Sequence, residues 1–410
     1  METSRRGLLG TAAAVLATGP AVRARAQQRP KVRIGVLTDL TGSYRDATGI
    51  TSVLCAQQAL EDFGVSGKGL DVEVLIEDHK NKPDRAVGIA RRWFEHGGVG
   101  VVADVPSSPV ALAVAEIAQA KDKILLDCSA TTTALTGQQC SPNTIVWSFD
   151  SYMLAKSSGA AAVQAGSKDW FFITADNAFG RSLEEQTAEL VTKGGGSVRG
   201  RARYPFPGTV DFSPLLQQAQ ASGAKVLGLA NAGLDTVNAI SQAHELGLRR
   251  FMQIAPLLMY ITDVHTLGLD VAAGLMLTET FYWDLNDRTR AFTERVRPKT
   301  RTNWPNMAHA SAYSGTLHYL KVVAEMGAGE AKRSGAATVA RMKQMPTDDD
   351  AFGQGGIRQD GRGMFPAYLF RVKTPEESRG AWDAYTLVDT TPATEALRPL
   401  SETGCRLVST

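Results

Sequence analysis

Two turns rich in hydroxyl groups are the stretches of this chain best suited to binding a small anion. The first turn, 106–109, reads Pro-Ser-Ser-Pro; it follows an apolar, β-branched run and precedes a strongly helical one. We expect Ser108 to cap that helix and Pro109 to take its first position, where the missing N–H costs nothing. The second turn, 128–133, follows the next apolar run. Because a helix N-terminus attracts negative charge, the two turns predict a pocket for a small carboxylate; alternatively, the hydroxyls serve only as caps and turn residues.

Apolar, β-branched runs alternate with helical runs through the first part of the chain. This alternation predicts a parallel sheet with helices on both faces, and ligands of such sheets bind outside the carboxyl ends of the strands. Both hydroxyl turns follow predicted strands, so we expect them to lie beside each other. The predicted strands are 32–37, 71–76, 98–103 and 123–126, and the predicted helices are 47–63, 83–95 and 110–118.

The same pattern restarts near residue 150 and predicts a second lobe of similar architecture. Residues 287–345 are then mostly helical, and short strands return only at 367–372 and 385–388. Late helices after two α/β lobes suggest that the chain crosses back to complete the first lobe. The predicted fold class is therefore α/β, with two doubly wound, Rossmann-like lobes. Lobe 1 is expected to comprise 27–149 plus about 282–355, and lobe 2 to comprise 150–281 plus about 356–410.

The first 26 residues predict an export signal. The twin-arginine pair Arg5-Arg6 precedes an Ala-rich apolar segment and the small-x-small cleavage site 24–26. This combination sends a folded chain to a bacterial periplasm, and the apolar segment is too short to span a membrane. Without residues 1–26 the chain has 40 basic and 41 acidic residues, a formal net charge of −1. Near-neutral charge and export argue against a nucleic-acid partner.

Four cysteines would enter this oxidising compartment, where disulfides persist. Cys55, Cys128, Cys140 and Cys405 allow three complete pairings, and their spacing does not choose among them. The sequence contains no Cys-x-x-Cys motif and its six histidines are scattered, so no metal or other cofactor is predicted.

Sequence motifs of common α/β enzymes are missing. No Gly-x-Gly-x-x-Gly follows the first strand, where 38–42 reads Thr-Asp-Leu-Thr-Gly, and neither a Gly-x-Ser-x-Gly elbow nor a Walker loop occurs. We therefore predict a binding protein without catalytic residues. A periplasmic α/β enzyme is the alternative from another class. A sensor ectodomain would need a signalling partner.

Four motifs occur in a consistent order: KVRIGVLTDLTG at 31–42, EDHKNKPD at 77–84, Ser-Ser at 107–108 and TADNAFG at 174–180. In this order they resemble the type I periplasmic solute-binding proteins, in the branch of the leucine/isoleucine/valine-binding proteins of ABC importers. The resemblance covers nearly all of 31–390. It implies two lobes joined by a hinge of three crossovers, closure of the lobes on a solute, membrane permease subunits as partners, and no catalysis.

The resemblance also implies binding roles for individual positions. In lobe 1 the solute's carboxylate would be held by Ser107 or Ser108, by the backbone of Ala130 and by the hydroxyl of Thr132. Phe179 falls where the family usually has a tyrosine that closes over the solute from lobe 2. The other implied site residues are Tyr44 in a first-lobe turn beside the cleft, Tyr152 at the crossover, and Asn231 and Asp235 at a strand end of lobe 2.

One departure from the family pattern concerns the solute. Amino-acid binders of this family hold the ammonium group with carboxylates, one of them just after the strand at 251–255. Here Pro256 is followed by Leu-Leu-Met-Tyr, with no acid. Burying an ammonium without a partner would cost on the order of several kcal/mol. Asp176 or Asp235 could supply the missing charge, although Asp176 could equally cap the helix that follows it.

Aromatic and apolar side chains near the implied cleft favour a different solute. They suit a carboxylate with an apolar body, so we predict an aromatic or branched organic acid, with an α-amino acid as the alternative. Each of these residues also has a purely structural alternative. Tyr152 could instead pack at the hinge, and Met259 and Tyr260 could serve only in local packing. The residues that carry this prediction are Tyr44, Tyr152, Phe179 and either Met259 or Tyr260.

The resemblance extends to two of the cysteines. The segment 135–142, which contains Cys140, resembles family members that also end in Gly-Cys-x-Leu-Val, as 404–408 does here. The resemblance thus implies a Cys140–Cys405 disulfide. It leaves Cys55 and Cys128 as buried thiols or as a second pair.

Overall fold

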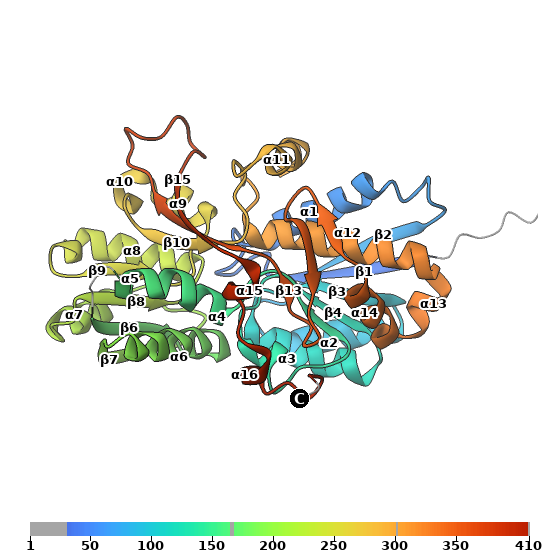
Figure 1. The fold of residues 1–410 in the computed structure, drawn as a ribbon, viewed down its shortest axis with the longest axis horizontal. Coiled ribbons are helices and arrows are strands. Elements are labelled where there is room, and N and C mark those ends of the chain that lie inside the picture. Colours follow the sequence, from blue (N-terminus) through green and yellow to red (C-terminus); the bar gives the residue numbers. More distant parts are fainter. Residues whose placement is uncertain (1–30, 165–167, 301, 409–410) are drawn as a thin grey trace, which may run out of the picture.

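The chain folds into two α/β lobes that lie side by side along the long axis of the molecule (Figure 1). The computed structural model describes residues 31–164, 168–300 and 302–408, so the predicted export signal at 1–26 lies outside the described residues. Each lobe contains a parallel sheet with helices packed on it, which confirms the predicted fold class. In Figure 1 the first lobe is on the right and the second on the left.

Lobe 1 is built on a five-stranded parallel sheet in the order β2-β1-β3-β4-β5. Helices α1 and α12 pack on one face and α2 and α3 on the other, so the central strand β3 is buried along its whole length. This explains why that strand is a continuous apolar run rather than an alternating one. The elements are β1 (Lys31–Thr38), α1 (Gly49–Phe63), β2 (Asp71–Asp78), α2 (Pro83–Glu95), β3 (Val99–Asp104), α3 (Ser108–Ala120), β4 (Ile124–Asp127) and β5 (Thr144–Val146), followed after lobe 2 by α11 (Asp287–Thr300), α12 (Met307–Met326), α13 (Ala328–Arg333) and α14 (Gly335–Gln344).

Lobe 2 repeats this architecture with a four-stranded parallel sheet in the order β7-β6-β8-β9. A second, antiparallel sheet, β10-β14-β15, combines strands from both sides of the late helices. The elements are α4 (Ser151–Leu154), a π-helical turn (Ala155–Gly159), α5 (Ala160–Gln164), β6 (Asp169–Ala175), α6 (Ala178–Lys193), β7 (Ser197–Tyr204), α7 (Ser213–Ala221), β8 (Val226–Ala230), α8 (Leu234–Glu245), β9 (Gln253–Pro256), α9 (Ile261–Leu267), α10 (Leu269–Ala272), β10 (Met276–Glu279), β14 (Ala367–Val372) and β15 (Tyr385–Thr391).

Three crossovers connect the lobes, and a buried arginine holds the first of them against the segment that leads into the third. Arg362, in that segment, donates from Nε to Asp150 Oδ2 at 2.8 Å and from Nη2 to the carbonyl oxygen of Ser148 at 3.1 Å, and both acceptors lie in the first crossover. Asp150 also caps α4 by accepting from the Met153 N–H at 2.9 Å. A fully buried ion pair is costly unless its remaining hydrogen-bonding groups are satisfied, and here they are.

The lobe boundary in the last third of the chain differs from the predicted one. We expected 356–410 to belong to lobe 2, but β12 (Gly353–Ile357) and β13 (Gly363–Met364) form a small sheet with β11 (Thr347–Asp349) against lobe 1. The N–H of Val146, in β5, donates to Gly361 O at 3.0 Å, which places this segment beside the edge of the first sheet. Short glycine-rich strands carry little periodicity, so the sequence pattern could not assign them.

The C-terminal tail leaves lobe 2 after β15 and returns to lobe 1. It contains α15 (Ala393–Ala396) and α16 (Leu400–Thr403) and runs between the lobes in Figure 1. A disulfide joins Cys405 to Cys140 in lobe 1, while Cys55 and Cys128 are buried free thiols.

Candidate functional site

A narrow cavity lies between the two lobes, at the carboxyl ends of β3, β4 and β8. Its lining is mainly apolar and aromatic, and among the described residues no charged side chain contributes to it. Lobe 1 supplies Tyr44, Ala47, Thr48, Pro106, Ser129 and Thr131, and lobe 2 supplies Phe179, Ala232, Leu258 and Tyr260.

Of the first hydroxyl turn only Pro106 lines the cavity; the predicted Ser107 and Ser108 do not, and the cap of the following helix also differs from the predicted one. The N-cap of α3 is Ser107, and Ser108 is already the first helical residue. The Ser108 hydroxyl, fully buried, accepts from the N–H groups of Thr131 and Thr132, both at 3.3 Å. It therefore joins the two turns, as the strand order predicted, but it does so by holding the second turn in place.

The second turn presents Ser129 and Thr131 to the cavity rather than the predicted Ala130 and Thr132. The N–H of Ala130 donates to Asp127 Oδ1 at 2.9 Å, and the Thr132 hydroxyl accepts from the Ala134 N–H at 3.4 Å. Both predicted groups are thus engaged within lobe 1. The hydroxyl of Thr131 is buried in the cavity wall and has no hydrogen-bond partner among the described residues. Successive side chains of an extended segment point to opposite sides. If the segment is displaced by one residue from the predicted register, the side chains that face the cavity are therefore the ones predicted to face away from it.

Tyr44, a predicted site residue, lines the cavity from a loop that is held by one buried carboxylate. Asp39 accepts from the N–H groups of Gly42 at 2.6 Å and Tyr44 at 3.0 Å, and from Asn81 Nδ2 at 2.6 Å. The Tyr44 ring stacks on Phe206 of lobe 2, with ring centroids 5.2 Å apart. Burial raises the pKa of the Tyr44 hydroxyl well above its usual value, so the group stays protonated.

Phe179, also predicted, enters the cavity from the first turn of α6. Asn177 caps this helix by accepting from the N–H groups of Phe179 at 2.9 Å and Gly180 at 3.0 Å, which fixes the position of the ring. The alternation after β9 places Leu258 and Tyr260 in the wall. Met259, the residue between them, packs in the core of lobe 2 instead.

The two acids considered as partners for an ammonium group are engaged elsewhere. Asp176 is partly exposed and forms an ion pair with Arg181 at 2.7 Å. Asp235 is buried and accepts from the Tyr204 hydroxyl at 2.8 Å, and burial raises its pKa to about 6. Asn231 is buried beside it, with its Oδ1 accepting from Thr236. None of the three predicted residues lies in the cavity wall.

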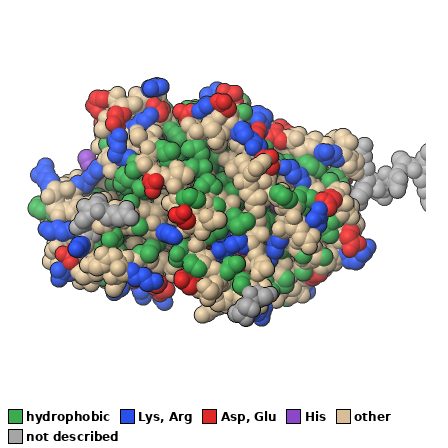
Figure 2. Space-filling model, viewed as in Figure 1, with side chains coloured by type: hydrophobic (Ala, Val, Ile, Leu, Met, Phe, Trp, Pro, Cys, Tyr) green, Lys and Arg blue, Asp and Glu red, His purple; other side chains and the backbone are tan. Residues whose placement is uncertain are grey.

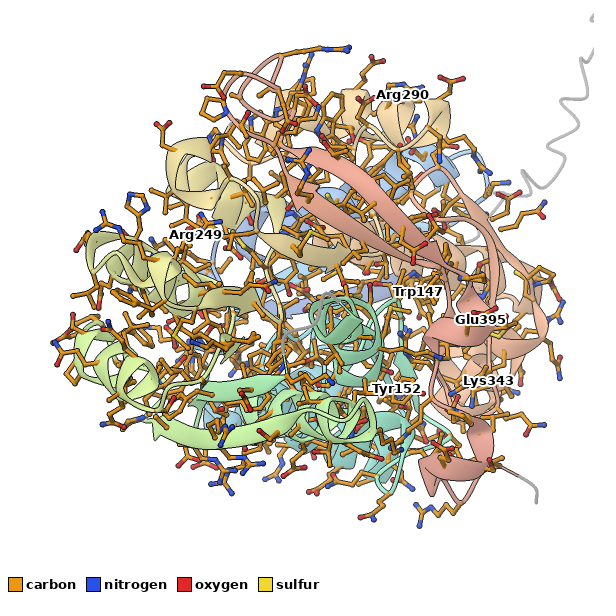
Figure 3. The ribbon with its side chains drawn as sticks, turned by 60° about the vertical axis from the view of Figure 1, so that its left-hand side comes forward. Trp147, Tyr152, Arg249, Arg290, Lys343 and Glu395 are labelled. Atoms are coloured by element: carbon orange, nitrogen blue, oxygen red, sulfur yellow. A yellow bond between two sulfur atoms is a disulfide. The ribbon has the colours of Figure 1, made fainter. Side chains whose placement is uncertain are left out.

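Tyr152 lies outside the cavity wall as well. It belongs to α4, at the start of lobe 2, and the Nζ atom of Lys156 is 5.9 Å from its ring centroid. Figure 3 shows Tyr152 and, on the tail, Glu395. Lys156 Nζ, in the π-helical turn after α4, donates to the carbonyl oxygen of Glu395, so this turn faces the tail.

The lobes are in contact across the cavity mouth. The N–H of Leu234 in lobe 2 donates to the carbonyl oxygen of Ser43 in lobe 1 at 3.0 Å. Gly233, with φ +60°, is required here, because a Cβ atom at this position would lie 2.4 Å from the Ser43 oxygen. The structure is thus a closed form.

A buried polar network connects the cavity floor to the hinge. His309 Nδ1 accepts from the Asn306 N–H at 3.2 Å, so the proton is on Nε2, which donates to Thr48 O at 3.0 Å. Asn306 Nδ2 donates to Ala47 O at 2.9 Å. Two backbone groups of the floor are therefore held by the start of α12. Burial lowers the pKa of His309 to about 3, so the ring is neutral.

Glu279 joins the two lobes at the second crossover. It accepts from the first N–H of α9 in lobe 2 (Ile261, 2.9 Å) and from the first N–H of α12 in lobe 1 (Met307, 3.1 Å). The Tyr385 hydroxyl donates to it at 3.0 Å. Burial outweighs these bonds and raises the pKa of Glu279 to about 8.

Two α/β lobes that meet through three crossovers around a closed cavity define a bilobed solute-binding protein. The chain belongs to the periplasmic binding protein family, whose model matches residues 31–381. It is a solute-binding protein of the ABC transporter type, and this family consists of binding proteins that work with membrane permeases. No curated protein sequence matches the chain.

Solved structures agree with this assignment. A periplasmic binding protein from Burkholderia mallei is 40% identical, with a TM-score of 0.89 over 93% of this chain and 100% of that one. A branched-chain amino acid ABC transporter periplasmic ligand-binding protein from Burkholderia xenovorans is 34% identical, with a TM-score of 0.80 over 92% and 99%. A solute-binding protein from R. palustris, solved with benzoate, shares the fold at 17% identity, with a TM-score of 0.80 over 92% and 99%.

Two further properties of the described residues concern the distribution of surface charge and the length of the helices. Figure 2 shows basic and acidic side chains interspersed over the visible face. Within the described ranges no helix has both the length and the apolar character needed to cross a bilayer.

Proposed function

We propose that this protein captures a small carboxylate with an aromatic or branched apolar body between its lobes in the periplasm, and delivers it to the permease subunits of an ABC importer. The observation that carries this proposal is the cavity lining, in which three aromatic rings and several hydroxyl groups meet without any charged side chain among the described residues. Such a lining matches a ligand with an apolar body and one polar end.

The polar end of the solute would meet hydroxyl and backbone donors of lobe 1. Thr131 Oγ1 is buried and unpartnered, and an unpartnered buried hydroxyl costs about 1–3 kcal/mol, which a solute oxygen would recover. Ser129 lies in the same wall, and the N-terminus of α3 begins beside it at Ser107 and Ser108. Helix N-termini favour anions.

The apolar body of the solute would be enclosed by Tyr44, Phe179 and Tyr260. Rings from both lobes meet in this part of the cavity, so contact with the body of the solute requires closure. Differential contact between the closed and open states is what drives hinge closure in such proteins.

The missing carboxylate argues against an α-amino acid. An ammonium group would need a carboxylate in the wall, but Asp176 pairs with Arg181 and Asp235 bonds to Tyr204. Several bacterial proteins of this fold were solved with benzoate, 4-hydroxybenzoate or 3,4-dihydroxybenzoic acid, which supports an aromatic acid. The second candidate, a branched-chain amino acid, is favoured by the similarity to the 34% identical Burkholderia xenovorans protein, a branched-chain amino acid ABC transporter periplasmic ligand-binding protein.

A thermal-shift screen of the exported chain separates these candidates. The panel contains benzoates, phenylpropanoid acids, branched keto acids and α-amino acids. A ligand present at 100 times its dissociation constant should add about 2.7 kcal/mol to the free energy of unfolding. We expect a rise in melting temperature with an aromatic or branched acid. A rise with leucine or another α-amino acid, and none with the acids, would contradict the proposal.

A further inference from the structure

A buried carboxyl lies directly behind one of the hydroxyls that line the cavity. Ser129 Oγ and Asp104 Oδ1 are hydrogen-bonded at 2.9 Å, and Asp104, the last residue of β3, is fully buried. Its second oxygen, Oδ2, is buried without a well-formed hydrogen bond to any described residue. Ser129 is thus the lining residue whose side chain bonds directly to Asp104.

The backbone around this carboxyl adopts a conformation that non-glycine residues rarely use. Asp104 has φ +77° and Val105 has φ +63°, and Pro106, the next residue, lines the cavity. Each such residue costs about 1–2 kcal/mol, so the surrounding structure must impose it. Two hydrogen bonds do so: Val105 N–H to Leu37 O and Cys128 N–H to Asp104 O, both at 3.0 Å.

The protonation state of Asp104 decides whether the Ser129 hydroxyl can donate a hydrogen bond into the cavity. A serine hydroxyl has one proton to donate, and an ionised carboxylate can only accept. When Asp104 is ionised, the Ser129 proton points to Asp104 and only oxygen lone pairs face the cavity, which repels a solute carboxylate. When Asp104 is protonated, the carboxyl donates to Ser129, and the Ser129 proton is free to point into the cavity.

The surroundings of Asp104 disfavour its ionised form. Burial raises the pKa of Asp104 to about 6 and the charge of Asp39 raises it further, although the hydroxyls of Thr38, Ser129 and Ser52 act in the opposite direction. The other titratable groups that interact with Asp104 are acids or thiols: Cys55 on α1, Asp127 and Cys128 at the end of β4, and Tyr260 from lobe 2.

We propose that Asp104 is a positioning residue that sets whether Ser129 donates a hydrogen bond to the solute or accepts one, so that capture of a carboxylate takes up one proton at Asp104. This inference rests on the proposed function. It adds that the cavity favours carboxylates on the acidic side of neutral pH, and that its preference shifts toward solutes with a donor at this position as the pH rises.

Isothermal titration calorimetry across pH tests the coupling. The probes are benzoate, 4-hydroxybenzoate and 4-methyl-2-oxopentanoate, titrated from pH 5.5 to 8.5 in two buffers with different ionisation enthalpies. For the wild-type chain we expect affinity to fall by a factor approaching ten per pH unit between 6.5 and 8.5, with net uptake of one proton. Asp104→Asn should bind as tightly as the wild type does at pH 5.5, and its affinity should not change with pH. Ser129→Ala should bind more weakly and also lose the pH dependence.

The control variant changes a buried acid outside the cavity wall, and each of three outcomes would overturn a proposal. Asp349→Asn removes another buried acid of lobe 1 that is paired with a serine, Ser314, but lies outside the cavity wall, and it should keep the wild-type slope. Wild-type affinity that does not vary with pH, with no proton uptake, would overturn this inference while leaving the proposed function intact. An Asp104→Asn variant with the wild-type slope would do the same. Absence of binding by all three acids at every pH would overturn the proposed function and this inference with it.

Discussion

At the scale of single residues, the ability of the cavity wall to bind a solute depends on which of its hydroxyl groups have no hydrogen-bond partner within lobe 1. The Ser108 hydroxyl joins the two turns and the Thr132 hydroxyl caps Ala134 within its own turn, whereas the hydroxyl of Thr131, a residue of the cavity wall, has no partner among the described residues. An unsatisfied buried group destabilises the empty protein and stabilises a complex in which a ligand supplies the partner. Thr131 is therefore the residue whose polar atom should contribute most clearly to binding and least to folding.

Replacing Thr131 by valine tests this role, because the two side chains have nearly the same shape. We expect Thr131→Val to leave the free energy of unfolding unchanged or slightly higher, since no hydrogen bond is lost in the empty protein. Affinity for a carboxylate solute should fall by about tenfold, equivalent to about 1.4 kcal/mol. Denaturant unfolding and calorimetric titration measure the two quantities. Unchanged affinity would mean that Thr131 does not contact the solute.

The binding roles predicted for individual residues stay predictions, and the structure shows only where those residues lie. The two hydroxyl turns do meet at the cavity, and Tyr44 and Phe179 line it. The sequence could not show which side chains of the second turn face the cavity. Their orientation is set by hydrogen bonds from the N–H groups of the turn to Asp127 and to the Ser108 hydroxyl.

At the scale of elements, closure brings the Tyr44 loop of lobe 1 against the N-terminus of α8 in lobe 2. The contact is a backbone hydrogen bond between Leu234 and Ser43, and it requires that residue 233 have no side chain. Closure is thus limited by one backbone-to-backbone approach. The sequence predicted a turn at Tyr44 beside the cleft, but the importance of Gly233 depends on a contact between segments far apart in the chain.

Replacing Gly233 by alanine should obstruct closure. The new Cβ atom would lie 2.4 Å from the Ser43 oxygen, so we expect affinity for the solute to fall by at least tenfold. The backbone at φ +60° and ψ −136° lies outside the left-handed helical region, so an alanine here also costs stability. Gly247→Ala is the control, because Gly247 has φ +63° and its added Cβ would meet only the Arg250 side chain, at 3.7 Å. Equal affinities of the two variants in calorimetric titrations would argue against this limit on closure.

Among the features at this scale, the path of the chain between the lobes was the hardest to predict from the sequence. The alternating pattern identified both sheets, and the late helix α12 packs on α1. The small sheet at 347–364 and the tail carry short strands and turns whose positions depend on tertiary contacts, such as the bond from Val146 to Gly361. Local patterns do not encode such contacts.

At the scale of the whole molecule, buried titratable groups at the hinge link stability to pH. Burial raises the pKa of Glu279 to about 8 and that of Asp263 to about 7, and it lowers the pKa of His309 to about 3. The histidine titrates near pH 6.5 in the unfolded chain and is neutral in both the folded and unfolded states only above about pH 7.5. In this range the carboxyls hold protons in the folded state that the unfolded chain has released, so stability falls as pH rises.

We therefore expect the free energy of unfolding to decline between pH 7.5 and 8.5, by at most about 1.4 kcal/mol per pH unit for each buried carboxyl. Glu279→Gln should reduce this slope, since the amide does not titrate. Glu330→Gln, at an exposed position on α13, should leave the slope unchanged. Chemical denaturation of the three proteins across this pH range provides the comparison, and identical slopes for all of them would exclude Glu279 as a source of the effect.

Small-angle X-ray scattering with and without a saturating aromatic or branched carboxylate tests the central claim most directly, because it reports closure of the two lobes on a solute. We predict that the radius of gyration of the wild-type chain decreases when the acid is added, and that it does not decrease for Gly233→Ala. A chain that binds the acid in a one-to-one complex with no change in its radius of gyration would contradict the account.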